Sequence, residues 1–165
     1  MKKTAPVLFF SLLLLICFCT KAQSYNIVKS QAFYRTRTAG NIAVDENGHP
    51  VSSGVSTDFL IYIETKGTTL PQWETAYIDG LPYSIRTAEV TSTPVKLGSL
   101  KGQNEPITIT KGPNTQLWQL LLSPQHTESR QTGKVNTLTL SGEFRNKKFT
   151  YRITRVQELA KRFNQ

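Results

Sequence analysis

Cysteine, histidine and methionine are scarce in this chain, and their scarcity excludes several kinds of chemistry. Its 165 residues include two Cys, two His and one Met. Both cysteines, Cys17 and Cys19, lie among the first 22 residues. If that segment is removed, the rest of the chain can hold no structural disulfide, thiolate metal site or cysteine nucleophile. Its stability must then come from a packed core.

Motifs of the common catalytic and metal-binding sites are also missing. The sequence has no Gly-x-Ser-x-Gly elbow, no Gly-rich phosphate loop and no His-Glu-x-x-His. His49 and His126 lie in polar, turn-like stretches without the spacing of metal ligands. The stretch Asp45-Glu46-Asn47-Gly48 is typical of a tight turn and lacks the spacing of a calcium loop. We therefore expect no catalytic residue, metal or cofactor.

A single long hydrophobic run occupies residues 5–19, directly after Lys2 and Lys3. It is shorter than the roughly 20 apolar residues that a membrane-spanning helix needs. Basic, apolar and small residues follow one another in the order of a secretory signal peptide, with Thr20 at position −3 and Ala22 at −1. The sequence thus predicts a signal peptide over residues 1–22, with cleavage after Ala22.

The two ends of this segment are similar to signal peptides of Gram-negative bacteria, particularly Bacteroidota. The similarity is confined to the Lys-Lys start and the Ala-Gln junction. It implies the periplasm, the outer membrane or the exterior as the destination. Acylation of Cys17 or Cys19, as in a lipoprotein, is disfavoured because Ile16 and Phe18 stand where a lipobox has a small residue. We expect a secreted or periplasmic protein.

Residues 23–165 have the composition and length of one folded domain. The chain is 38% hydrophobic and 19% charged, and its 10 Gly and 8 Pro are scattered, which excludes collagen-like and disordered classes. Segments of five to ten residues rich in Val, Ile, Thr, Tyr and Phe are separated by turn signals. This pattern predicts an all-β fold, a single antiparallel β-sandwich of the immunoglobulin-like or a related type, with about seven to ten strands.

Strands are expected at the following places: residues 27–38, 57–65, 73–78, 82–90, 95–97, 107–110, 117–122, 136–144 and 149–154. Asn47-Gly48, Asp79-Gly80 and a turn near Asn146 are the hairpin signals. Periodicity alone allows a short buried helix over 117–122, but the flanking Gly and Pro favour a strand. A short C-terminal helical turn is expected over residues 156–163, where Val156, Leu159 and Phe163 have helical spacing.

Aromatic and acidic residues allow two further hypotheses. Trp73 follows Leu70-Pro71-Gln72 and is a candidate for a half-exposed aromatic platform, whereas Trp118 lies in an apolar run and is expected in the core. Carboxylates could be paired as in a glycosidase. The candidates are Glu64, Glu74, Asp79 and Glu89.

The basic residues form the sharpest feature. Residues 23–129 carry 8 basic and 9 acidic groups, whereas residues 130–165 carry 9 basic and 2 acidic groups. If the first strand and the last hairpin share a sheet, their cations would form one positive surface able to bind phosphate, sulfate or carboxylate. The ligand-binding candidates are Arg35, Arg37, Arg145, Lys147, Lys148 and Arg152.

These observations favour a non-enzymatic binding or assembly module of a bacterial cell envelope. Its partner would be a protein, bound by strand addition, or an anionic polysaccharide or lipid headgroup, bound by the basic surface. The alternatives are a secreted polysaccharide-acting hydrolase and a structural subunit of a surface assembly. Nucleic acid is not an expected partner, and a membrane would be contacted only peripherally. The sequence does not specify an oligomeric state.

Overall fold

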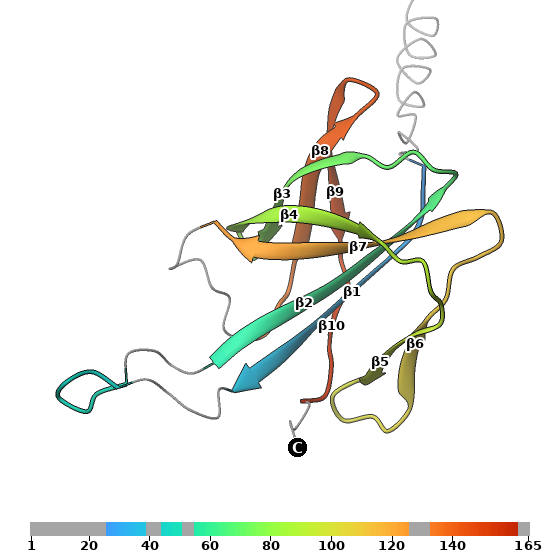
Figure 1. Ribbon diagram of the computed structural model, residues 1–165. Helices are drawn as coiled ribbons and strands as arrows, with labels where there is room; N and C mark the ends of the chain where they lie inside the picture. The colour runs from blue at the N-terminus through green and yellow to red at the C-terminus, as the bar shows by residue number, and fades with distance from the viewer. Residues whose placement is uncertain (1–25, 39–43, 51–54, 126–132, 162–165) are drawn as a thin grey trace, which may run out of the picture.

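β-Strands make up almost all of the regular structure of this protein (Figure 1). The computed structural model describes residues 26–38, 44–50, 55–125 and 133–161. The predicted signal peptide, its cleavage site at Ala22, and His126 lie outside these residues. Within them, no helix has the length and apolar character needed to cross a membrane. The expectation of an all-β fold is confirmed.

The described residues form ten strands. Their bounds are β1 Ile27–Thr38, β2 Val55–Lys66, β3 Gln72–Ile78, β4 Leu81–Glu89, β5 Val95–Ser99, β6 Pro106–Ile109, β7 Thr115–Pro124, β8 Leu138–Phe144, β9 Lys147–Ile153 and β10 Val156–Glu158. Each strand segment expected from the sequence corresponds to one of these. The run at 117–122 is part of a strand, as its flanking Gly and Pro indicate.

Eight strands form one curled sheet in the order β10-β1-β2-β7-β4-β3-β8-β9, and β5 and β6 form a separate hairpin. Neighbouring strands are antiparallel except β1 and β10, which are parallel. Strands β9 and β10 are consecutive in the chain yet lie at opposite ends of the sheet order. The sheet therefore curls back on itself, and the Ser30 and Tyr151 hydroxyls meet at 3.0 Å. This arrangement is sandwich-like.

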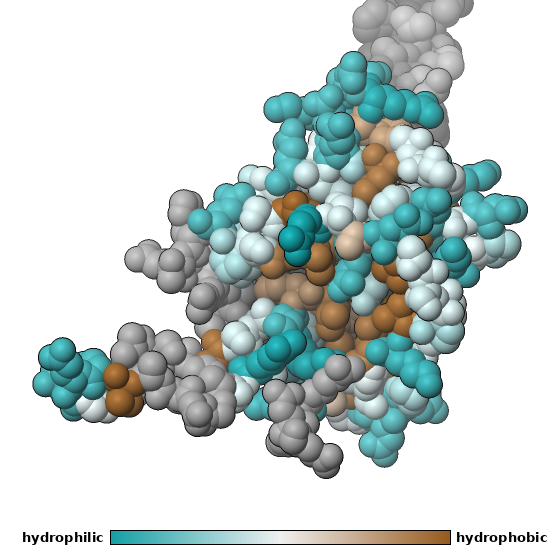
Figure 2. All heavy atoms as spheres, in the orientation of Figure 1, coloured by the Kyte–Doolittle hydropathy of each residue, from teal (hydrophilic) through white to brown (hydrophobic). Residues whose placement is uncertain are grey.

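The curled sheet has a core on each face of its central strands. Strand β1 contributes Ala32 and Tyr34 to an inner core and Phe33 to an outer core. Strand β2 does the same with Ile63 and Tyr62, as expected for a strand that is apolar on both faces. The β5–β6 hairpin covers the outer core, and Figure 2 shows hydrophobic atoms between the middle of the sheet and this hairpin.

Two tight turns connect the strands on which the candidate site lies. Asp79 and Gly80 between β3 and β4 have φ values of 47° and 89°, and Arg145 and Asn146 between β8 and β9 have 52° and 60°. Positive φ at both central residues is the geometry of a type I′ turn, which matches the twist of paired strands. The hairpins predicted at Asp79-Gly80 and near Asn146 are therefore present.

The expected C-terminal helical turn is wrong. Val156–Glu158 form strand β10, and Leu159 makes an isolated bridge with Leu100. The alternation explains this result: Val156 packs against the inner core, whereas Leu159 lies in the outer core. Apolar side chains on both faces suit a strand between two cores better than a helix with one apolar stripe. Phe163 lies outside the described residues.

Candidate functional site

The β8–β9 hairpin gathers four of the six predicted ligand-binding cations. Arg145, Lys147, Lys148 and Arg152 are all exposed, and within the described part of the chain none of them forms an ion pair. The Arg145 guanidinium lies 5.3 Å from the centroid of the Phe144 ring, a cation–π contact. These four residues are called the basic hairpin below.

Alternation along β9 determines which side chains the basic hairpin exposes. Phe149 and Ile153 are buried, and Tyr151 packs against the inner core. Lys148, Thr150 and Arg152 therefore point to the opposite side, away from the core. The outward face of β9 can carry the two cations Lys148 and Arg152 because the opposite face contributes to the stability of the fold.

Register extends this polar side across three neighbouring strands. Arg152 on β9 pairs with Thr139 on β8, which pairs with Tyr77 on β3. A second row contains Thr150, Ser141, Thr75 and Ser84, and a third contains Lys148, Glu143 and Gln72. These three rows are called the outer face below. It presents hydroxyl groups, the two cations Lys148 and Arg152, the aromatic ring of Tyr77 and the carboxylate of Glu143, which lies opposite Lys148.

Trp73, the predicted aromatic platform, lies on the other side of the sheet. Its ring meets the buried Phe149 at 5.4 Å in an edge-to-face contact, and it packs against the inner core. The pairing of β3 with β8 shifts register between Trp73 and Thr75. This bulge inserts one residue, so that Trp73 turns inward while Tyr77, four residues later, turns outward. Tyr77 is 41% exposed and is the aromatic ring of the outer face.

Arg35 and Arg37 lie apart from the basic hairpin, on β1. Arg35 is 6% exposed, and its guanidinium donates hydrogen bonds to the main-chain carbonyls of Leu97 and Ala160. Arg37 is exposed and pairs with Asp58 on β2. The structure thus makes Arg35 a structural residue, and it does not unite the six predicted cations on one surface.

Two of the carboxylates considered for a hydrolase hold the backbone in place. The buried Glu64 accepts hydrogen bonds from the Gly112 amide at 2.7 Å and the Thr115 hydroxyl at 2.6 Å. Asp79 accepts hydrogen bonds from the Asn136 and Thr137 amides. Burial alone would raise the pKa of Asp79, but these hydrogen bonds outweigh it and lower the pKa. Both carboxylates therefore have structural partners.

Strands β2 and β7 diverge towards one end (Figure 1). Residues of both strands line a cavity of about 280 Å³. Their pairing ends at Ile61 and Leu120. Beyond that point the cavity is walled mainly by apolar groups, including Phe59 and Tyr83, whose rings meet at 5.5 Å. Among the described residues that line the cavity, Asp58 is the one carboxylate, and it is paired with Arg37. The described part of the cavity wall therefore holds no pair of carboxylates.

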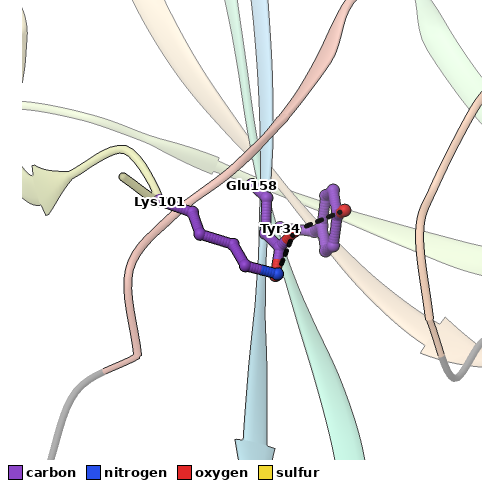
Figure 3. A network of polar contacts seen from close by, with 3 residues as sticks. All are labelled: Tyr34, Lys101 and Glu158. Carbon is purple, nitrogen blue, oxygen red and sulfur yellow. Dashed lines mark hydrogen bonds and ion pairs between the residues drawn. The ribbon is translucent and has the colours of Figure 1, made fainter. Parts of the chain in front are cut away.

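A polar network joins β1 and β10 to the segment that follows β5 (Figure 3). The Tyr34 hydroxyl donates a hydrogen bond to Glu158 at 3.2 Å. The Lys101 ammonium contacts both carboxylate oxygens of Glu158, at 2.9 and 3.0 Å. The Lys101 amide also donates to the Glu158 carbonyl. Glu158 is thus fixed by side-chain and main-chain contacts from two directions.

Neither a search for metal-binding clusters nor comparison with known proteins identifies another candidate site. No group of three or more His, Cys, Asp or Glu that could hold a metal ion occurs in the described ranges. The candidate site therefore consists of the basic hairpin and the outer face. Neither family models nor curated proteins nor solved structures give a match to this chain.

Proposed function

We propose that this protein is a non-enzymatic binding module of a bacterial cell envelope, secreted or periplasmic, that holds an anionic glycan on its outer face. The observation that carries the proposal is the basic hairpin: four exposed cations without ion-pair partners among the described residues, beside the exposed ring of Tyr77. Cations supply attraction to carboxylate, sulfate or phosphate groups. Hydroxyl groups and an aromatic ring suit the polar edges and the apolar faces of sugars.

The spacing of the outer face fits an extended chain better than a compact ligand. Lys148 and Arg152 are four residues apart on one strand, which corresponds to about 13 Å. Arg152 and Tyr77 are two strands apart, which corresponds to about 10 Å. A polymer with repeating acidic groups can contact both cations at once, and each contact raises the effective concentration for the next.

The edges of the curled sheet favour a glycan over a protein that adds a strand. Its two terminal strands in the described structure are β10, which has three residues, and β9, which carries Lys147, Lys148 and Arg152. Short edges and charged edges are the devices by which proteins prevent strand addition. The same cations that hinder strand addition attract an acidic polymer.

Charge reversal in two variants with the same net charge tests the proposal. One variant carries Arg145→Glu, Lys147→Glu, Lys148→Glu and Arg152→Glu. The matched control reverses four exposed cations outside the basic hairpin: Lys66→Glu, Arg86→Glu, Lys96→Glu and Lys111→Glu. Retention on immobilised heparin and on lipopolysaccharide is measured at low salt.

We expect the hairpin variant to lose retention and the control to keep most of it. The interaction should also weaken steeply as salt rises, because the Debye length falls from about 30 Å at 0.01 M to about 10 Å at 0.1 M. Equal loss in both variants would mean that total charge, and not this surface, causes retention. Unchanged retention in the hairpin variant would overturn the proposal.

A further inference from the structure

A second cavity lies on the side of the molecule that carries the C-terminal strand. It has a volume of about 510 Å³ and is bounded by β1, β10 and residues 133–135. In Figure 1 the β8–β9 turn lies at the top, whereas β10 runs through the lower half. The described residues that line the cavity include none of the basic hairpin. Its volume is within the roughly 300–1,000 Å³ of small-molecule sites.

The described residues that line this cavity include three lysines and one carboxylate, which together carry a net charge of +2. The lysines are Lys101, Lys134 and Lys161, and the carboxylate is Glu158. They come from three separate segments of the chain. A concave surface with an excess of positive charge concentrates its electric field and attracts anions.

The carboxylate of Glu158 faces Tyr34 and Lys101, and this contact fixes Lys101 at the cavity wall. Its oxygens are occupied by the Tyr34 hydroxyl and by Lys101. An ammonium has three N–H donors, and Lys101 directs donors at the two oxygens of Glu158, so a third remains for a ligand. Burial and the nearby Glu158 raise the pKa of Tyr34, which keeps its hydroxyl a donor at neutral pH. Glu158 is thus already neutralised.

Beside the charged wall the cavity has an apolar wall. Val135 is buried in the inner core, Val156 packs against it, and the Tyr34 ring belongs to the same core. Val135 and Tyr34 are almost fully buried, so the half-buried Val156 supplies the apolar side chain that is open at the cavity. An inorganic ion would leave that side chain in water. A molecule with an apolar body can cover it, and each buried CH₂ group contributes about 0.8 kcal/mol.

We propose that this cavity binds a small organic anion, with its phosphate or carboxylate group among Lys101, Lys134 and Lys161 and its apolar body against Val156. The positive charge of the lysines favours an anionic group, and Val156 favours a ligand with an apolar part. This site is independent of the glycan surface. It gives the protein a second ligand that differs in size and in place.

Titration of ¹⁵N-labelled protein followed by NMR tests this site. The probes are phenyl phosphate and benzoate, with phenol as the uncharged control. We expect saturable shifts of the Val135 and Val156 amides with at least one of the two anions, and no saturable shifts with phenol. Whichever anion binds more tightly identifies the phosphate or the carboxylate as the preferred group. Shifts that are equal with phenol, or absent with both anions, would refute the site.

Matched variants separate this site from the glycan surface. Lys134→Glu with Lys161→Glu should weaken anion binding at least tenfold, whereas Lys147→Glu with Lys148→Glu changes the net charge equally and should leave it unchanged. The second pair should instead weaken retention on heparin. If the double variant does not fold, Lys161→Glu alone should weaken binding about threefold, because separate charges contribute additively. Unaltered binding in these Lys161 variants would contradict the proposal.

Discussion

The Nη2 atom of Arg35 lies 2.5 Å from the main-chain carbonyl oxygen of Leu97, and this hydrogen bond ties β1 to β5 across the outer core. The Nε atom of the same guanidinium donates to the Ala160 carbonyl at 3.2 Å. Arg35 therefore links the first strand, the β5–β6 hairpin and the C-terminal segment. Its guanidinium is therefore a structural hydrogen-bond donor and does not add a positive charge to the ligand-accessible surface.

Replacement of Arg35 should destabilise the protein far more than replacement of Arg37. Arg35→Met leaves two carbonyls without their donor in a buried place, and we expect the free energy of unfolding to fall by about 2–4 kcal/mol. Arg37 has a side chain that is 64% exposed and pairs with Asp58, so Arg37→Met should cost less than about 1 kcal/mol. Urea denaturation of both variants measures the difference. Similar losses in the two variants would contradict the structural role of Arg35.

Tyr77 and Trp73 should have opposite effects on binding and stability. Tyr77 is exposed on the outer face, so Tyr77→Ser should weaken glycan retention by about fivefold, or about 1 kcal/mol of lost stacking, with little loss of stability. Trp73 packs on Phe149, so Trp73→Ala should cost about 3 kcal/mol of stability or more. Affinity chromatography and thermal denaturation of the two variants test this. Full retention by the Tyr77 variant would exclude its ring from the binding surface.

Asp79 should make stability depend on pH in the acidic range. Its pKa is lowered in the folded state, where hydrogen bonds from Thr137 and Asn136 outweigh burial. A lowered pKa stabilises the fold above the unfolded value of about 3.9, and this stabilisation disappears as the pH falls through the folded value. Asp79→Asn should therefore cost about 1–2 kcal/mol at pH 7, and the difference from the unaltered protein should shrink below about pH 4. Denaturation at pH 7 and pH 3 measures both quantities. A difference that is independent of pH would contradict the assignment.

Local patterns were sufficient to predict most strands of this fold. The alternation of Leu138 and Leu140 with polar residues indicated β8, and Asn146 indicated the turn to β9. Such signals are short-range, because side-chain direction in a strand and the φ preference of a turn depend on adjacent residues. The four cations of the basic hairpin follow from the same rules, which is why the sequence could identify them.

Features that depend on distant contacts could not be predicted in this way. Arg35 shares a face of β1 with Arg37, as the alternation indicated, but its burial depends on the β5–β6 hairpin, whose position no local pattern gives. Val156 and Leu159 have helical spacing, yet a core lies on each side of β10. The position of Trp73 depends on a bulge in β3 that strict alternation does not contain.

The bulge itself depends on Gly142, and this gives the last prediction. A Cβ atom on Gly142 would lie 2.4 Å from the Gln72 carbonyl oxygen and 3.2 Å from the Trp73 Cα. Both obstacles are backbone, so a side chain cannot move aside to relieve the contact. Gly142→Ala should therefore push β3 and β8 apart and lower the free energy of unfolding by about 3 kcal/mol.

The neighbouring Ser141→Ala is the control for this change. The Ser141 hydroxyl donates one hydrogen bond to the Thr75 carbonyl, so its loss should cost about 1 kcal/mol. Displacement of Trp73 from Phe149 in the Gly142 variant should also alter the tryptophan fluorescence spectrum, which the Ser141 variant should leave unchanged. If Gly142→Ala folds with full stability and an unaltered spectrum, then the close approach of β3 to β8 does not hold Trp73 inward, and Trp73 returns as a candidate for the binding surface.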